Sequence, residues 1–180
     1  MISDFIFELG SLKRLPRSGW LTIGIQNPET VAEHVYRTAI IGMLLAREEG
    51  ADESRVTRIC LLHDLHEGRS ADLHTAARRY AKIDVRKANR EIFTNNKLGN
   101  EFLGLCREFE DGKTLEAVVA GDADRLECLV QAKEYLDLGN KYAADWINGA
   151  RKLLKTKTAR KWAGEIVRRD SNAWLLKIRE

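Results

Sequence analysis

Apolar residues recur at helical spacing along almost the whole of this 180-residue sequence. The separations of three and four residues between Ile2, Phe5, Ile6 and Leu9 are a typical example, and no run alternates between apolar and polar residues for long enough to predict a strand. The two prolines, Pro16 and Pro28, both lie near the N-terminus and interrupt no later helix. We therefore predict an all-α fold, a single helical bundle.

Capping signals divide this pattern into separate helices. Thr30-x-x-Glu33 is a capping box that opens a helix ending near Gly50, and Asp52 or Ser54 opens the next one. Thr114 caps a long helix that runs to about residue 138. Shorter helices are predicted at about 71–80, 85–94, 143–154 and 158–169.

The composition is that of a soluble globular protein, with 44% hydrophobic and 32% charged residues. Its length suits one domain, 1–180, with a core at about 28–138 and C-terminal helices at about 142–180 packed on it. No apolar run is long enough to span a bilayer, and the N-terminus lacks the features of a secretory signal. Three cysteines without a pairing pattern predict reduced thiols, so we expect a cytoplasmic protein without a membrane partner.

The net charge of +3 is unevenly distributed. Residues 151–180 contain ten Lys or Arg against three Asp or Glu, which leaves the rest of the chain acidic. Such a basic segment is compatible with a nucleic-acid-binding module. A solvated helix surface is the favoured interpretation, because Trp162 and Trp174 stand at spacings that suit core packing, so a nucleic-acid partner is not expected.

An ionisable cluster stands inside an apolar run at residues 61–67, Leu-Leu-His-Asp-Leu-His-Glu. Burying unpaired charge is costly, so such a cluster favours a partner such as a metal ion. On one helix, His63 and Glu67 would share a face with Asp64 about 100° away. Imidazole and carboxylate together suit a divalent cation. A capped or salt-bridged surface pair is the ordinary alternative for an isolated His-Asp.

Further ligands have to come from other helices. His34 lies near the start of the second helix, beside Val31 and Val35. In the long helix, Asp124 shares a face with small residues that would let a metal ion approach, and Asp122 is the competing candidate. An ordinary salt bridge is the alternative for either aspartate. If His34, His63, Asp64 and Asp124 converge, two imidazoles and two carboxylates neutralise one divalent ion.

At these residues the sequence resembles the HD-domain metal-dependent phosphohydrolases, and within them the 5'-deoxynucleotidase branch. The stretches that carry the resemblance occupy about the first two-thirds of the chain and are Arg17-Ser18-Gly19-Trp20, 29–34, 63–67, Asp72-Leu73 and 122–127. The fold that the resemblance implies is a single HD-domain helical bundle.

The resemblance also implies an activity and its residues. The activity is hydrolysis of a deoxyribonucleoside 5'-monophosphate, a small-molecule nucleotide, to nucleoside and phosphate. One divalent metal ion (Co, Mn, Zn, Ni or Mg) would be bound, and the protein would be a homodimer. The implied residues are His34, His63, Asp64 and Asp124 as metal ligands, Glu67 and Asp72 as catalytic residues, and Arg17 and Trp20 as substrate-binding residues. His66 and His74 have no role in the family pattern.

Two alternatives remain at this stage. The HD scaffold also serves hydrolysis of nucleoside triphosphates, alarmones and cyclic dinucleotides. Triphosphates should need more basic groups than Arg17, and Arg78, Arg79 and Lys82 are candidates. The second alternative is a non-catalytic helical module whose basic C-terminal face binds nucleic acid, which predicts salt-sensitive binding that does not depend on metal.

Overall fold

The computed structural model describes residues 2–94, 97 and 99–178. Within these residues the chain is helical, and its only β-type pairing is an isolated bridge between Pro16 and Thr30. The all-α prediction is therefore confirmed. No helix in the described part combines the length and apolar character needed to cross a membrane.

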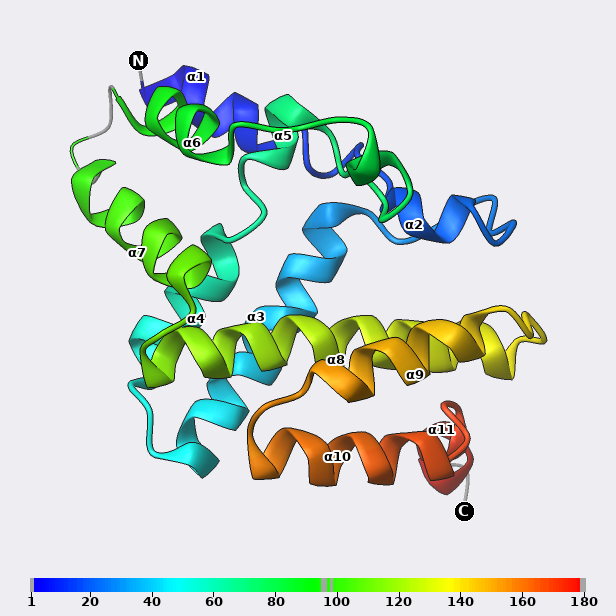
Figure 1. Cartoon of the computed structure of the whole chain (residues 1–180). Coiled ribbons are helices and arrows are strands. Elements are labelled where there is room, and N and C mark those ends of the chain that lie inside the picture. The colour runs from blue at the N-terminus through cyan, green and yellow to red at the C-terminus, as the bar shows by residue number, and fades with distance from the viewer. Residues whose placement is uncertain (1, 95–96, 98, 179–180) are drawn as a thin grey trace.

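The long helix α8 (Leu115–Asp137) crosses the middle of the molecule and organises the rest (Figure 1). Helices α3 (Val31–Glu49), α4 (Glu53–Leu62) and α9 (Ala143–Leu153) pack against it. Its buried side chains occupy successive turns and include Val119, Leu126 and Leu129. Because α8 contacts helices from both the first and the last third of the chain, side chains on α8 can meet groups that are far apart in sequence.

The caps predicted from sequence are present. The Thr30 hydroxyl accepts a hydrogen bond from the Glu33 backbone, and the Glu33 carboxylate accepts one from the Thr30 backbone. Gly50 ends α3 with φ of 72°, a left-handed conformation that suits glycine. The side chain of Asp52 caps α4, and that of Thr114 caps α8. These local signals therefore begin and end the helices that approach the site.

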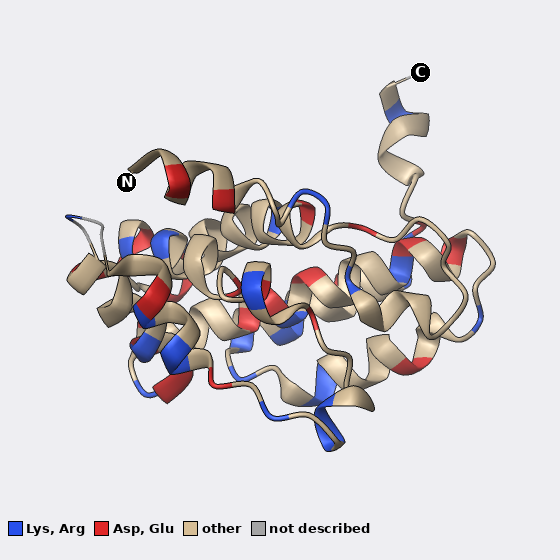
Figure 2. Cartoon of the chain, turned by 90° about the horizontal axis from the view of Figure 1, so that it is seen from above, with Lys and Arg blue, Asp and Glu red and all other residues tan. Residues whose placement is uncertain are grey.

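The remaining helices surround this centre. They are α1 (Ile2–Leu9), α2 (Ser18–Leu21), α5 (Glu67–Ser70), α6 (Val85–Phe93), α7 (Gly99–Asp111), α10 (Lys157–Arg168) and α11 (Ala173–Ile178), with a 3-10 turn at Ala77–Arg79. Helices α6 and α7 pack on each other, α7 also packs on α4 and α8, and α10 packs on α8. Figure 2 shows α11, which has no buried residue, standing away from the other helices.

Two predictions of secondary structure were wrong. Helix α4 ends at Leu62, so His63 is its C-terminal cap and Glu67 opens the separate helix α5. The segment 71–80 contains only the 3-10 turn, because Ala71 adopts a φ of 61° and the Asp72 carboxylate accepts a hydrogen bond from the distant Ser18 backbone. The His-Asp pair therefore lies at the end of a helix.

Candidate metal centre

The two imidazoles predicted as ligands face each other in the interior. His34 is in the first turns of α3, and His63 follows the last residue of α4. Their rings are edge to face with centroids 5.5 Å apart. Each Nε2 atom is buried and lacks a geometrically good hydrogen bond, whereas each Nδ1 has a partner. Both rings therefore direct their unpaired nitrogens into the same space.

The hydrogen bonds on the far side of each ring determine which nitrogen is available. The Nδ1–H of His63 donates to the Cys60 carbonyl oxygen at 2.7 Å, and Nδ1 of His34 pairs with the Glu127 carboxylate. Glu127 in turn accepts a hydrogen bond from Arg37 Nε at 2.8 Å. A donor at Nδ1 leaves the Nε2 lone pair free, which is how outer partners orient metal-binding histidines.

Two carboxylates complete the cluster. The Oδ2 atom of Asp64 lies 3.2 Å from His63 Nε2 and 3.6 Å from His34 Nε2. Asp124 comes from the middle of α8, with Oδ1 3.3 Å from His34 Nε2 and 3.9 Å from His63 Nε2. Ligand atoms bound at about 2.1 Å from one ion lie roughly 3 to 3.5 Å apart. The separations and the buried, unpaired imidazole nitrogens fit a divalent cation.

The competing aspartate is directed elsewhere. Asp122 is fully buried and accepts hydrogen bonds from the backbone N–H groups of Lys155, at 2.9 Å, and Thr156, at 2.7 Å. It therefore ties α8 to the loop that opens α10 and does not reach the cluster. Asp124 is the aspartate on the metal side.

Burial and neighbouring charges both shift the pKa values of the residues in the cluster. Burial raises the pKa of Asp64, but His63, Arg17 and His34 outweigh that effect and hold the pKa well below its usual range. Burial and Arg17 lower the pKa of His34, whereas the nearby carboxylates of Asp124 and Glu127 raise it, with a net result of about 10. The imidazole thus holds a proton that a bound cation would displace.

Arg17, Glu67 and Asp72 surround this cluster. Arg17 Nη1 donates to Asp64 Oδ2 at 3.2 Å. Glu67 is 2% exposed, with Oε2 unpartnered and Oε1 3.8 Å from Arg78 Nη2. Asp72 Oδ2 accepts a hydrogen bond from the Ser18 backbone at 2.8 Å, which holds the loop that carries Arg17. Arg17 and Glu67 thus line the cavity at the cluster, whereas Asp72 lines a smaller neighbouring cavity that it shares with Arg17.

Trp20 lies in the interior of the protein. Its side chain is 1% exposed, its Nε1–H donates to Glu29 Oε1 at 2.9 Å, and its ring packs on Trp146 and Tyr135. A side chain this deeply buried anchors the arginine loop, and it lines a cavity of about 140 Å³ together with Arg17. Substrate binding by Trp20 stays a prediction.

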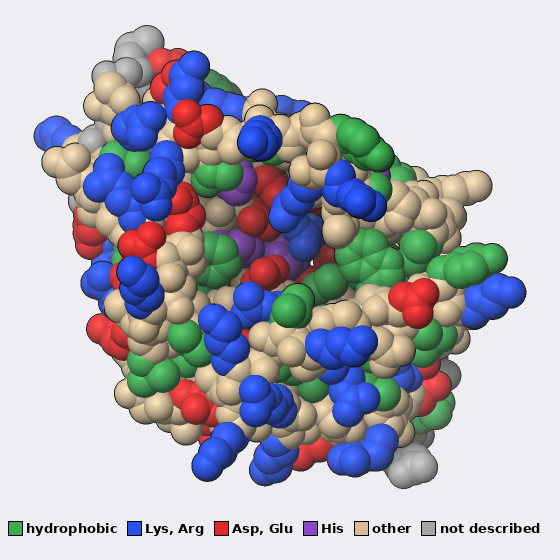
Figure 3. All heavy atoms as spheres, viewed as in Figure 1, with side chains coloured by type: hydrophobic (Ala, Val, Ile, Leu, Met, Phe, Trp, Pro, Cys, Tyr) green, Lys and Arg blue, Asp and Glu red, His purple; other side chains and the backbone are tan. Residues whose placement is uncertain are grey.

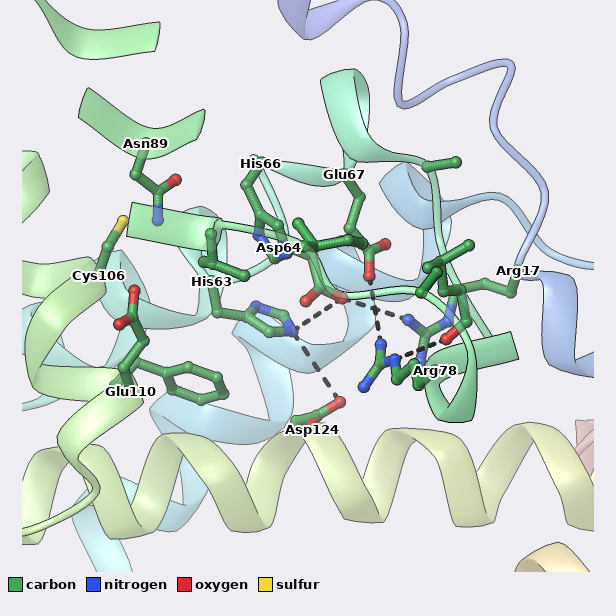
Figure 4. A pocket seen from close by; sticks show the side chains of 16 residues that line it. Arg17, His63, Asp64, His66, Glu67, Arg78, Asn89, Cys106, Glu110 and Asp124 are labelled. Atoms are coloured by element: carbon green, nitrogen blue, oxygen red, sulfur yellow. Dashed lines mark hydrogen bonds and ion pairs between the residues drawn. The ribbon is translucent and has the colours of Figure 1, made fainter. Parts of the chain in front are cut away.

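A cavity of about 560 Å³ opens directly onto the cluster (Figure 4). His63, Asp64 and Asp124 lie at its middle, with Arg17, Glu67 and Arg78 to one side and Asn89, Cys106 and Glu110 to the other. Seen from outside, it is a hollow in which acidic and histidine side chains gather below a basic rim (Figure 3). Its volume is within the range of small-molecule sites.

Several side chains of this region carried no prediction. Glu127 follows Asp124 by three residues and so shares its helical face, a spacing that indicates a supporting position. Glu29, His34 and Glu127 also bring ligand-type atoms together, but Arg37 and Trp20 already bond these carboxylates, so this group supports His34. Of the two unassigned histidines, His66 lines the cavity and His74 lines a smaller neighbouring one. No local signal indicated Asn89 or Trp146.

A model of the HD domain family matches residues 9–166 of the sequence. The chain belongs to the HD domain family. It is 34% identical over 144 residues to the 5'-deoxynucleotidase HDDC2 of Dictyostelium discoideum, covering 73% of this chain and 76% of that protein. The human protein of the same name is 31% identical, covering 77% and 70%.

Solved structures share the fold of this chain. A Pyrococcus horikoshii protein has a TM-score of 0.77 and 30% identity, covering 93% of this chain and 99% of that one. A structure described as a predicted metal-dependent phosphohydrolase from Magnetospirillum magnetotacticum has a TM-score of 0.71 and 25% identity, covering 92% and 88%. The four residues predicted from the sequence as metal ligands, His34, His63, Asp64 and Asp124, converge in this chain.

Proposed function

We propose that this HD-domain protein is a metal-dependent 5'-deoxynucleotidase, which hydrolyses deoxyribonucleoside 5'-monophosphates to a deoxyribonucleoside and phosphate. The observation that carries the proposal is the convergence of two imidazoles, two carboxylates, Arg17 and Glu67 around one cavity. Curated proteins 31 to 34% identical over most of their length bear the name 5'-deoxynucleotidase.

His34, His63, Asp64 and Asp124 would hold one divalent ion. The donor set of imidazole and carboxylate accepts Co, Mn, Zn, Ni or Mg, so it does not select among these metals. Bound there, the ion would act as a Lewis acid toward a phosphoryl oxygen and would make water more acidic. Two carboxylates neutralise its charge. Phosphate binding and proton transfer are then left to the side chains around it.

Arg17 is the phosphate-binding group in this proposal. Its guanidinium lies at the edge of the ligand cluster, bonded to Asp64, and offers further N–H donors to the cavity. A planar fork binds two phosphate oxygens at once, which a lysine ammonium cannot do. Ser18, next in sequence, is held by Asp72, and Trp20 is buried, so the arginine is positioned before substrate arrives.

Glu67 is the proton-transfer group in this proposal. Burial and the nearby charges of Asp64 and Asp72 raise its pKa to about 9. A divalent cation beside it would lower that pKa toward neutrality, because an opposite charge favours the carboxylate. A buried carboxyl that titrates near neutral pH can take a proton from the attacking water and deliver one to the departing 5'-oxygen.

The cavity favours a monophosphate over a triphosphate. Of the three basic residues considered for a triphosphate, Arg78 lines the cavity, whereas Arg79 and Lys82 do not. Arg78 is also engaged, because its Nε donates to the Leu73 carbonyl oxygen at 2.6 Å. A phosphate monoester carries at most two negative charges, which Arg17 and Arg78 match, whereas a triphosphate would bring further charges that no other basic residue of this set meets in the cavity.

The deciding experiment measures phosphate release by chelated protein, with each of the five metals added back, from deoxynucleoside and ribonucleoside mono-, di- and triphosphates. We expect metal-dependent release from deoxynucleoside monophosphates. Arg17→Lys should lower it strongly, and the matched change Arg14→Lys, at an exposed position outside the cavity, should not. A dominant triphosphate signal, or metal binding without phosphate release from any monophosphate, would overturn the proposal.

We also propose that the chain forms a homodimer. Helix α3 exposes an apolar stripe of Tyr36, Ile40 and Leu44, spaced four residues apart on one face. A second copy of this chain would cover it. Light scattering coupled to size exclusion tests the proposal: the wild type should elute with twice the chain mass, and Ile40→Glu should elute as a monomer. A monomeric wild type would contradict it.

For the organisation of the chain, we propose one HD domain over residues 1–180, with the helices beyond about residue 142 packed on the metal-site core. The contacts of α9 and α10 with α8 support it. The cysteines at 60, 106 and 128 are free thiols, which supports a reducing compartment such as the cytoplasm.

A further inference from the structure

The cavity continues past the metal centre to a wall that the proposed reaction leaves without a role. Figure 4 shows Arg17 and Arg78 at one end and Asn89, Cys106 and Glu110 at the other, with the ligand cluster between them. Asn89 comes from α6, and Cys106, Phe109 and Glu110 come from α7. With phosphate held near the arginines and the cluster, this wall faces the nucleoside.

Asn89 is an unusual residue for this position. It is 3% exposed and faces the interior with Ile92 and Phe93, the apolar buried residues of α6. Its Oδ1 atom has no hydrogen-bond partner among the described residues, although the side chain lines the cavity. A buried amide oxygen without a partner destabilises a fold, and an apolar side chain would pack there without that cost. The arrangement indicates a partner that arrives with the substrate.

Two neighbouring polar residues, His66 and Glu110, also line the cavity. His66 lines the same cavity, and its Nδ1 is buried without a partner. Glu110 has one carboxylate oxygen on Arg86 Nε, at 2.9 Å, and can accept hydrogen bonds from the cavity with the other. The Phe109 ring, 5.0 Å from the His63 ring, provides an apolar surface between this wall and the metal centre.

We propose that Asn89 and Glu110 form the base-binding subsite of this enzyme, an inference that rests on the proposed function. An asparagine amide pairs with any base edge that places a donor beside an acceptor. Glu110 only accepts, so it favours an amino group at that edge and repels a carbonyl oxygen. At position 6 of a purine or 4 of a pyrimidine, adenine and cytosine present an amino group beside an unprotonated ring nitrogen. Guanine and thymine present a carbonyl beside a ring N–H at the same position, and the guanine amino group lies on the far side of that N–H. The substrates selected are therefore dAMP and dCMP.

A second cavity beside Arg17 offers the other possible position for the base. It has a volume of about 430 Å³ and is lined by Trp146, Leu153 and other residues of α9. A base stacked on that indole would be bound through its π-face, which every base has, and would not be selected by its edge. The base profile of suitable variants therefore separates the two positions.

The test uses metal-loaded full-length protein and measures kcat and KM for dAMP, dCMP, dGMP, dTMP and the baseless probe 2-deoxyribose 5-phosphate. We expect wild-type kcat/KM to be about tenfold higher for dAMP and dCMP than for dGMP and dTMP, as for one well-placed pair of hydrogen bonds. Asn89→Leu should raise KM for dAMP and dCMP about tenfold, leave kcat nearly unchanged, and leave the baseless probe unaffected.

Two further variants make the result specific. Asn89→Asp replaces the N–H donor that pairs with the ring nitrogen of adenine or cytosine by an acceptor, so it should weaken dAMP and dCMP. The ring N–H of guanine or thymine can donate to the new carboxylate, so the preference should narrow or reverse. Asn148→Leu makes the same chemical change as Asn89→Leu on α9, where the side chain lines a different cavity, and should alter no base preference. The melting temperature of each variant shows whether it folds, and Asn89→Asp answers the question if Asn89→Leu does not.

The outcomes are distinguishable from failure of the proposed function. If no nucleotide is hydrolysed by the metal-loaded wild type, the function itself is wrong. If the nucleotides are hydrolysed without base preference, or if Asn89→Asp leaves the profile of the wild type unchanged, the subsite is wrong. A loss of affinity for all four nucleotides in Trp146→Ala, with Asn89 variants unaffected, would place the base on α9.

Discussion

Asp122 and Asp124 stand two residues apart on α8, and the structure uses them in opposite ways. Asp122 is fully buried among backbone N–H donors from the loop before α10. Asp124 faces the cavity, beside the unpaired nitrogens of His34 and His63. Two residues on a helix are about 200° apart around its axis, so the two carboxylates leave α8 on different sides. Asp122 therefore stabilises the packing of α8 against the loop before α10, whereas Asp124 is available to bind a cation.

The comparison shows what makes a carboxylate on a core helix a candidate ligand. The two residues differ in exposure, since Asp122 is fully buried and the Asp124 side chain is 31% exposed. They also differ in whether the surroundings already satisfy the charge. Asp122 has peptide donors within 3.0 Å on both oxygens, and Asp124 meets two imidazole Nε2 atoms that have no hydrogen bond of their own. A carboxylate is available to a metal ion where its neighbours are also unsatisfied.

The largest expected effect comes from replacing each of the two aspartates by asparagine. Asp124→Asn should lower metal-dependent phosphate release more than about 100-fold, since even outer partners of a metal site are worth 10- to 100-fold. Asp122→Asn should leave that activity per folded molecule nearly intact but lower the free energy of unfolding by about 2 kcal/mol, because peptide donors lose a charged acceptor. Chemical denaturation and phosphate release measure the two. Equal losses of stability with unchanged activity in both variants would break the comparison.

Glu127 sharpens the comparison, because it is a buried carboxylate that is satisfied and yet serves the site. It holds Nδ1 of His34 and accepts a hydrogen bond from Arg37. Glu127→Gln should weaken metal affinity about 10- to 100-fold while leaving most of the fold intact. Isothermal titration with the preferred metal gives the affinity, and Glu134→Gln, a second partner of Arg37, is the matched control. Unchanged metal affinity in Glu127→Gln would show that Glu127 does not support His34 as a ligand.

The pH dependence of metal binding tests whether His34, which lies beside Asp124, is a metal ligand. The pKa of His34 is raised to about 10 by its carboxylate neighbours, so near neutral pH the imidazole holds a proton that must leave before a cation binds. Metal affinity should therefore fall as pH falls, by close to tenfold per pH unit for each proton released. Titrations in buffers of different ionisation enthalpy count those protons. Affinity that is constant between pH 6 and 8 would contradict the assignment of His34 as a ligand.

The smallest expected effect concerns Trp20. Trp20→Phe removes the hydrogen bond from Nε1 to Glu29 while keeping an aromatic ring between Tyr135 and Trp146. It should cost about 1 kcal/mol of unfolding free energy with little change in KM, because the side chain is buried. Denaturation and steady-state kinetics test this. A raised KM for deoxynucleotides at unchanged stability would indicate that Trp20 contacts the substrate, as the family resemblance implies.

Much of this site could be predicted from sequence because the chemistry is concentrated in short stretches. The His63-Asp64 pair in an apolar run, His34 beside a capping box, and an aspartate on a small-residue face of the long helix are each visible locally. Asp122 and Asp124 could not be separated locally, because the donors that satisfy Asp122 belong to residues 155 and 156. Tertiary contacts decided between them.

The same reason explains what sequence analysis missed. The end of α4 at Leu62 and the non-helical segment after Ser70 depend on contacts with the Arg17 loop, such as the bond from Ser18 to Asp72. Burial of Trp20 depends on Tyr135 and Trp146, more than 100 residues away. Asn89 is an ordinary helix residue until α7 and the metal centre enclose a cavity beside it. Helical periodicity reports which face is apolar and does not report what that face meets.

Gly19 has a consequence that extends to the far end of the chain. A Cβ atom at this position would lie 2.4 Å from the Trp146 ring, so the backbone beside Arg17 rests directly on an indole from α9. A polypeptide interrupted before residue 140 would retain the four ligands, the glutamate and the arginine. It would lose the surface against which the arginine's loop is seated. The last part of the molecule, which supplies no reacting group, is by this contact a component of the catalytic architecture.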